Sequence, residues 1–140
     1  MYEDRVPLVR ILMVEDNPAD AEILTEVLAA DDRSPFRIQW VERLADAIER
    51  LSNTEFDVVL LDLKLPDSDG LESIDRIHAT SETVPVVVMT GFDDDALAAE
   101  AKRRGARGYL VKGRTSIDYI KQVLTAAAVE PTSRPTAVNA

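Results

Sequence analysis

The sequence contains no cysteine and only one histidine, and no apolar run approaches the length of a membrane span. Without cysteine, the protein needs neither disulfides nor thiol metal ligands, which suits a cytoplasmic location. A helix that crosses a bilayer needs roughly 20 apolar residues, and the N-terminus M-Y-E-D-R-V-P lacks the pattern of a secretory signal. We therefore expect a cytoplasmic protein with no membrane insertion.

Positive charge is also scarce. The chain has 16 Lys and Arg against 26 Asp and Glu, a formal net charge of -10. This charge opposes non-specific attraction to nucleic acid and to anionic membranes, and it suits a cation or a partner with a basic surface. The 140 residues, 46% of them hydrophobic, suffice for one domain with its own core. We expect a single domain that does not bind nucleic acid.

The most informative stretch is D-V-V-L-L-D-L-K-L-P-D-S-D-G, residues 57–70. Its branched apolar run, from Val58 to Leu61, is typical of a strand buried on both faces of a parallel sheet, and it stops at Asp62. Turn-forming residues follow, before a helix that starts near Leu71. Ligands of open α/β sheets bind at the carboxyl ends of strands, so Asp62 is a candidate for chemistry. On this stretch alone, an exposed loop acid is an equally good interpretation.

Hydrophobic patterning alternates strands with helices along the whole chain. The expected strands cover residues 8–14, 36–41, 58–61, 84–89 and 108–111, and the expected helices have apolar stripes within 18–30, 44–51, 71–77, 93–104 and 117–127. Alternation of this kind predicts an α/β fold, a flavodoxin-like doubly wound parallel sheet of five strands with five helices. The domain is expected over 8–129, between an N-terminal lead, 1–7, and a disordered C-terminal tail, 130–140.

Four of the five strands end in an unusual polar residue. Glu15 and Asp16 follow the first strand, Asp62 the third, Thr90 the fourth and Lys112 the fifth. If the strand order is 2-1-3-4-5, these ends lie side by side at the topological switch point, where the strand order reverses and where such sheets bind ligands. Each residue has an ordinary interpretation by itself, but their coincidence predicts a site built from four segments.

The chemistry of this set favours a hard divalent cation. Three neighbouring carboxylates raise one another's pKa, and Mg²⁺, which takes oxygen ligands and retains several waters, relieves that repulsion. The absence of histidine and cysteine from these strand ends argues against zinc. Lys112 suits a phosphoryl oxygen as a point charge. Away from the site, we expect His78 to be an exposed helix residue and Trp40 to serve in packing.

Four motifs, in this order, resemble the receiver domain of bacterial two-component response regulators, over about residues 8–128. They are V-E-D-N-P, L-L-D-L-K-L-P-D-S-D-G-L-E, V-V-V-M-T-G and G-Y-L-V-K-G. The resemblance implies the 2-1-3-4-5 strand order as well. It also implies that Asp62 is the phosphoacceptor, which takes a phosphoryl group from a histidine kinase or a histidine phosphotransfer protein.

The same resemblance assigns the metal ligands. Asp16 and Asp62 would bind Mg²⁺ together with the backbone carbonyl of Lys64, and Glu15 would act mainly through a bound water. Lys112 would pair with the phosphoryl group.

A conformational switch is also implied by the resemblance. Thr90 would turn its hydroxyl toward the phosphoryl group as Tyr109, the aromatic switch residue, swings inward. Lys64 and Phe92 lie where the family tunes the lifetime of the phosphoryl group. The family commonly has a proline with a cis peptide bond after the lysine, and this chain departs from that pattern at Gly113.

The roughly ten residues after the last helix are too few for an effector domain. We therefore expect a stand-alone receiver, not an enzyme, that controls a downstream protein target or passes phosphate to a second relay component. By resemblance, its output surface comprises the fourth helix, the fifth strand and the fifth helix, and the phosphorylated form could dimerise.

Two alternatives come from other classes of protein. A receiver-like scaffold that is never phosphorylated would have no need to crowd three carboxylates. A Mg²⁺-dependent phosphatase of the haloacid dehalogenase type also uses an aspartate nucleophile. It should carry D-x-D after the first strand, where this chain has Glu15-Asp16-Asn17.

Overall fold

Five parallel strands form the central sheet of the computed structural model, which describes residues 7–30 and 32–129. The strand order is β2-β1-β3-β6-β7, which is the expected 2-1-3-4-5 order for the five main strands. The strands are β1 (Val9–Val14), β2 (Phe36–Val41), β3 (Val58–Leu61), β6 (Val86–Thr90) and β7 (Gly108–Val111). Most of the expected N-terminal lead and the expected disordered tail, 130–140, lie outside the described residues.

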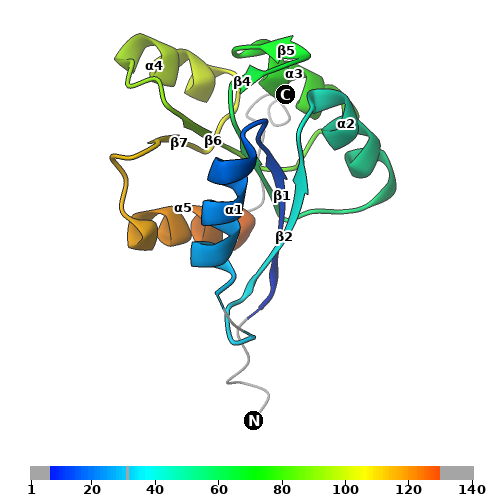
Figure 1. Cartoon of the computed structure of the whole chain (residues 1–140). Helices are drawn as coiled ribbons and strands as arrows, with labels where there is room; N and C mark the ends of the chain where they lie inside the picture. The colour runs from blue at the N-terminus through cyan, green and yellow to red at the C-terminus, as the bar shows by residue number, and fades with distance from the viewer. Residues whose placement is uncertain (1–6, 31, 130–140) are drawn as a thin grey trace.

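Helices cover both faces of this sheet, as Figure 1 shows. The first and last helices pack on one face, and the three between them pack on the other. They are α1 (Pro18–Leu28), α2 (Leu44–Asn53), α3 (Glu72–Thr80), α4 (Asp95–Arg103) and α5 (Ile117–Val129). The flavodoxin-like doubly wound fold is confirmed.

The side chains of β1 show why this sheet needs both layers. Ile11 and Met13 pack with α1 and α5, whereas Leu12 and Val14 pack with α2, α3 and α4. All four are almost completely buried. Successive strand residues point to opposite faces, so a central strand covered on both sides is apolar at every position.

Several element boundaries differ from the sequence prediction by one to three residues. The first strand begins at Val9 instead of Leu8, and α1 ends at Leu28, two residues before its expected end. The fourth main strand is Val86–Thr90 and not 84–89, and α4 spans Asp95–Arg103 and not 93–104, with Asp94 as its N-cap. Pro85 has no amide hydrogen, although its carbonyl accepts a bond from the amide of Val59.

A short antiparallel hairpin after β3 was not predicted. It consists of β4 (Lys64–Leu65) and β5 (Ser68–Asp69). The sequence analysis identified only turn-forming residues here, because two-residue strands are too short for an alternating pattern.

Two side chains differ from their expected roles. His78 is half-buried, with Nε2 3.0 Å from the carbonyl oxygen of Val84, so the expectation of an exposed side chain was wrong. Trp40 is 38% exposed, and its indole N–H donates to the carbonyl of Glu15 at 2.7 Å. The buried core residues of β2 are instead Phe36 and Val41, which are 3% and 6% exposed.

Among the described residues, no helix has both the length and the apolar character that crossing a membrane requires.

Candidate functional site

The hydrogen-bond ladder of the sheet brings the polar strand ends together. The amide of Asp62 donates to the carbonyl of Val14, the residue before Glu15, at 3.0 Å. The amide of Lys112 donates to the carbonyl of Thr90 at 2.8 Å. Parallel strands in register therefore place six of the predicted site residues at one edge of the sheet, beside an open cleft of about 480 Å³: Glu15, Asp16, Asp62, Lys64, Thr90 and Lys112. Tyr109 does not line this cleft.

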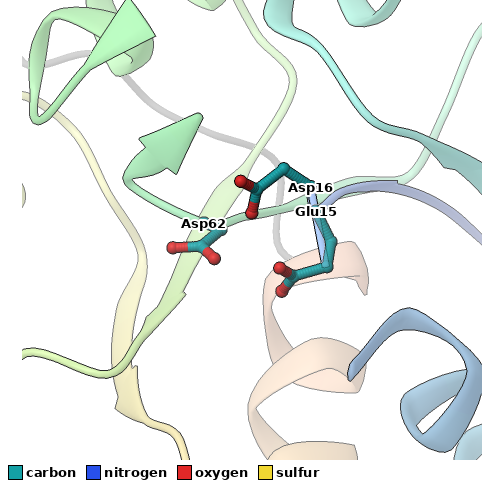
Figure 2. Close-up of side chains that lie close together, drawn as sticks. All are labelled: Glu15, Asp16 and Asp62. Atoms are coloured by element: carbon teal, nitrogen blue, oxygen red, sulfur yellow. The ribbon is translucent and has the colours of Figure 1, made fainter. Parts of the chain in front are cut away.

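Glu15, Asp16 and Asp62 form an acidic pocket, in which each residue offers a carboxylate oxygen within 4.8 Å of the others. Figure 2 shows the three carboxyl groups gathered around one region beyond the strand ends. Glu15 and Asp62 are only 2% and 6% exposed, whereas Asp16 is exposed. Oxygen-only donors of this kind are able to hold a hard divalent cation.

Each buried carboxylate of the acidic pocket accepts bonds at both of its oxygens. In Glu15, Oε1 lies 2.7 Å from the ammonium of Lys112 and Oε2 accepts the amide of Asn17 at 3.1 Å. In Asp62, Oδ2 lies 2.9 Å from the same ammonium and Oδ1 accepts the amide of Lys64 at 3.1 Å. These bonds replace the water that the two groups lose on burial.

Asp20 is a fourth carboxylate at this site, and the sequence analysis missed it. Its Oδ2 lies 2.9 Å from the ammonium of Lys112. The sequence contained a signal, because Asp20 follows the N-cap Asn17 by three residues and so lies in the first turn of α1, next to the end of β1. Asn17 orients that first turn of α1, since its Oδ1 accepts the amide of Asp20 at 3.1 Å.

The pKa values of Glu15 and Lys112 are both raised, which favours the neutral form of Glu15 and the charged form of Lys112. Burial raises the pKa of Glu15 to about 7, although the bonds from Lys112 and Asn17 partly oppose it. Burial lowers the pKa of Lys112, but hydrogen bonds to Glu15, Asp20 and Asp62 outweigh that effect and raise it well above its ordinary value. Lys112 is therefore a fixed positive charge at neutral pH.

Thr90 is 1% exposed, and its Oγ1 has no hydrogen-bond partner among the described residues. It lines the same cleft as Asp62 and Lys112. An unpaired buried hydroxyl costs free energy, so an oxygen ligand that enters the cleft would find a donor already available there.

Tyr109 is half-buried in β7, and its hydroxyl donates to the carbonyl of Phe92 at 2.6 Å. Burial, together with the charges of Asp94 and Asp93, raises the pKa of Tyr109. This bond links Tyr109 to the loop that begins just after Thr90.

The loop after Lys112 differs from the pattern with proline. No peptide bond among the described residues is cis, so the Lys112–Gly113 bond is trans. Gly113 has φ +80°, a left-handed conformation that favours glycine.

Comparison with known proteins gives a consistent result. Residues 11–125 match the family model described as "Response regulator receiver domain". The chain is 34% identical to the swarming motility regulation protein RssB of Serratia marcescens over 113 residues, which are 81% of this chain and 50% of RssB. It spans about half the length, or less, of the curated relatives that it matches first.

Two solved structures illustrate the structural similarity. The signal receiver domain of a putative LuxO repressor protein from Vibrio parahaemolyticus is 26% identical, with a TM-score of 0.75 over 95% of this chain and 98% of that one. The receiver domain of sensor histidine kinase PA1611 from Pseudomonas aeruginosa PAO1 is 22% identical, with a TM-score of 0.75 over 88% and 99% of the two chains. That second structure has a magnesium ion coordinated in its active site cleft.

Proposed function

This chain belongs to the response regulator receiver domain family of two-component signalling, which is not a family of classical enzymes, and we propose that Asp62 is its phosphoacceptor. The family implies a kinase partner. The donor would be the phosphohistidine of a histidine kinase or of a histidine phosphotransfer protein. The acting unit would be the domain over 8–129.

One observation carries this proposal. The buried carboxylate of Asp62 lies beside the fixed positive charge of Lys112 at 2.9 Å, in the cleft that also contains the unpartnered hydroxyl of Thr90. A nucleophile, a cation and a free donor at one cleft are what phosphoryl transfer to a carboxylate requires. A protein that only binds partners gains nothing from burying these groups together.

In the proposed step, an Asp62 carboxylate oxygen attacks the phosphorus of the phosphohistidine. An acyl phosphate O–P bond forms as the N–P bond breaks, and the bonding pair returns to the imidazole, which leaves as neutral histidine after taking up a proton. The Lys112 ammonium pairs with the phosphoryl charge, and the Thr90 hydroxyl donates to a phosphoryl oxygen. Catalysis of this kind is positioning and charge neutralisation.

The acidic pocket fits Mg²⁺ by its donor chemistry, since its members are carboxylates alone. Asp16, Asp62 and the Lys64 carbonyl would hold the ion, with Glu15 acting mainly through a water. When bound, it supplies positive charge to the carboxylates and to phosphoryl oxygens. The magnesium ion in the PA1611 receiver domain supports this assignment.

Thr90 and Tyr109 would form the conformational switch. A bond from the Thr90 hydroxyl to the phosphoryl group would displace the loop that contains Phe92, whose carbonyl now accepts the Tyr109 hydroxyl. The phosphorylated form would favour one of two conformations, and a downstream protein or a second relay component would bind that conformation better.

The test is intact mass after incubation with Mg²⁺ and acetyl phosphate, for the wild type beside Asp62→Asn. We expect one added phosphoryl group, labile and absent from the variant. Binding of beryllofluoride, a stable phosphoryl mimic, gives a second arm. Beryllofluoride binding without a mass adduct would mean rapid loss of the phosphoryl group. Absence of both would overturn the proposal in favour of a scaffold that is never phosphorylated.

A further inference from the structure

Asp20 lies outside the acidic pocket, but it contacts the same Lys112 ammonium as Glu15 and Asp62 do. The Lys112 ammonium contacts Glu15 at 2.7 Å and both Asp20 and Asp62 at 2.9 Å. A lysine ammonium has three N–H donors. Its three carboxylate partners therefore match its whole donor capacity, and a phosphoryl group on Asp62 would have to displace one of them.

The three partners differ in how easily they release the ammonium. Glu15 is buried, and its second oxygen is fixed by the Asn17 amide. Asp62 would itself carry the phosphoryl group. The Asp20 side chain is 40% exposed, so water can replace the bond that it loses. Asp20 is thus the partner that gives up Lys112 at the least cost.

We infer that Asp20 is a positioning residue that holds Lys112 toward α1 in the unphosphorylated protein and competes with the phosphoryl group for its ammonium. The inference rests on the proposed function of Asp62 as the phosphoacceptor. Asp20 would shift the balance toward the unphosphorylated state, because its bond to Lys112 must break when the phosphoryl group takes its place.

The same contact acts in the opposite direction on Mg²⁺. While Asp20 engages Lys112, the ammonium competes less strongly with a cation for Glu15 and Asp62. The Asp20 charge also adds to the negative potential of the cleft. Asp20 therefore favours Mg²⁺ and disfavours the phosphoryl group.

The experiment measures both affinities by titration calorimetry for the wild type and Asp20→Asn. The probes are Mg²⁺ alone and then beryllofluoride at saturating Mg²⁺. We expect the substitution to weaken Mg²⁺ binding and to tighten beryllofluoride binding, each by about two- to fivefold, the range for a partly exposed ion pair. Asp20→Ala, which also removes the acceptor oxygen, should likewise weaken Mg²⁺ binding and tighten beryllofluoride binding.

The matched control is Glu22→Gln, which removes the same charge from an exposed position of the same helix. It should leave beryllofluoride binding close to the wild type, because Glu22 is not among the partners of Lys112. Damage to the cleft would weaken the binding of both Mg²⁺ and beryllofluoride. A gain in beryllofluoride affinity therefore separates competition for Lys112 from a merely structural effect.

The outcomes also separate this inference from the proposed function. Wild-type protein that binds beryllofluoride in an Asp62-dependent way, with Asp20→Asn binding equally or more weakly, would overturn the role of Asp20 alone. An equal gain in Glu22→Gln would do the same, since it would show a diffuse charge effect. Failure of the wild type to bind beryllofluoride would overturn both.

Discussion

A half-buried lysine and a buried threonine at this site differ in how their hydrogen-bonding capacity is met. Lys112 has a carboxylate for each of its donors, whereas the hydroxyl of Thr90 has no partner among the described residues. Buried polar groups are normally paired, and an unpaired one costs free energy that a bound ligand can recover. The unpaired Thr90 hydroxyl therefore costs free energy in the unliganded protein, and a bound ligand that accepts its hydrogen bond recovers that cost.

Replacement of Thr90 by valine tests this trade-off. Valine has nearly the same shape and no hydroxyl, so Thr90→Val should raise the free energy of unfolding by about 1 kcal/mol. The same variant should bind beryllofluoride more weakly than the wild type, because it lacks the donor. Urea denaturation measures the first effect, and calorimetry measures the second.

Thr90→Ser is the matched control, since it keeps the hydroxyl and loses only a methyl group. It should retain more beryllofluoride affinity than Thr90→Val while being less stable. A Thr90→Val protein that is both less stable and unimpaired in binding would contradict the account.

Among the secondary structure elements, the β4–β5 hairpin has a role that its sequence did not reveal. Helix α2 begins after Arg43, which makes no side-chain cap. Asp67, between the two hairpin strands, supplies the cap instead, with its Oδ1 and Oδ2 accepting the amides of Leu44 and Ala45 at 2.8 and 2.9 Å. The hairpin that follows Asp62 is thereby tied to a helix that precedes it.

The cap should be visible in both stability and its pH dependence. Burial by itself would raise the pKa of Asp67, but the bonds from Ala45 and Leu44 together outweigh burial and lower the pKa below the ordinary value of 3.8. A lowered pKa contributes stability above the ordinary value, and that contribution is lost as the pH falls through the pKa of the folded state. Asp67→Ala should therefore lower the free energy of unfolding at pH 7 by about 1 kcal/mol.

Urea denaturation of the wild type and Asp67→Ala from pH 7 downward measures this effect. The difference between the two proteins should shrink as the pH falls below about 4. Asp67→Asn, which can still accept hydrogen bonds, should lose less stability at pH 7. The difference in stability between Asp67→Asn and Asp67→Ala should not change with pH, because neither side chain titrates. A wild-type advantage that grew toward acid pH would have the wrong sign.

The whole molecule carries a formal net charge of -10, and part of that charge is concentrated at one edge of its sheet. Glu15, Asp20 and Asp62 share the ammonium of Lys112, and Asp16 lies beside Glu15 and Asp62 in the acidic pocket. Folding must bring these carboxylates together against their repulsion, so a cation that binds only the folded state stabilises the protein.

Millimolar Mg²⁺ should therefore raise the melting temperature. At a concentration 100 times its Kd, the gain is about 2.7 kcal/mol. Asp16→Asn, which removes an exposed member of the acidic pocket, should reduce the shift. Differential scanning calorimetry with NaCl at matched ionic strength separates specific binding from screening. An equal shift in NaCl, or none across a wide Mg²⁺ titration, would count against the metal site.

The alternation of strands and helices, the sheet type and the residues of the acidic pocket were all predictable from the amino-acid sequence. Apolar periodicity is a local property, and it records which faces of each element are buried. The site could be located because parallel strands in one sheet all end at the same edge, so Glu15, Asp62, Thr90 and Lys112 had to meet there once the strand order was known. The strand order itself came with the resemblance to a known family.

Only the tertiary structure revealed which side chains satisfy which partners. Asp20 and Lys112 are 92 positions apart, and Asp67 lies 23 positions from the Leu44 amide that it caps. The indole of Trp40 donates to a carbonyl 25 positions away. Contacts of this kind depend on the register of neighbouring elements and on side-chain direction, which packing determines and local patterns do not record. The sequence by itself therefore determined which groups gather at the strand ends, and packing decided how they are paired.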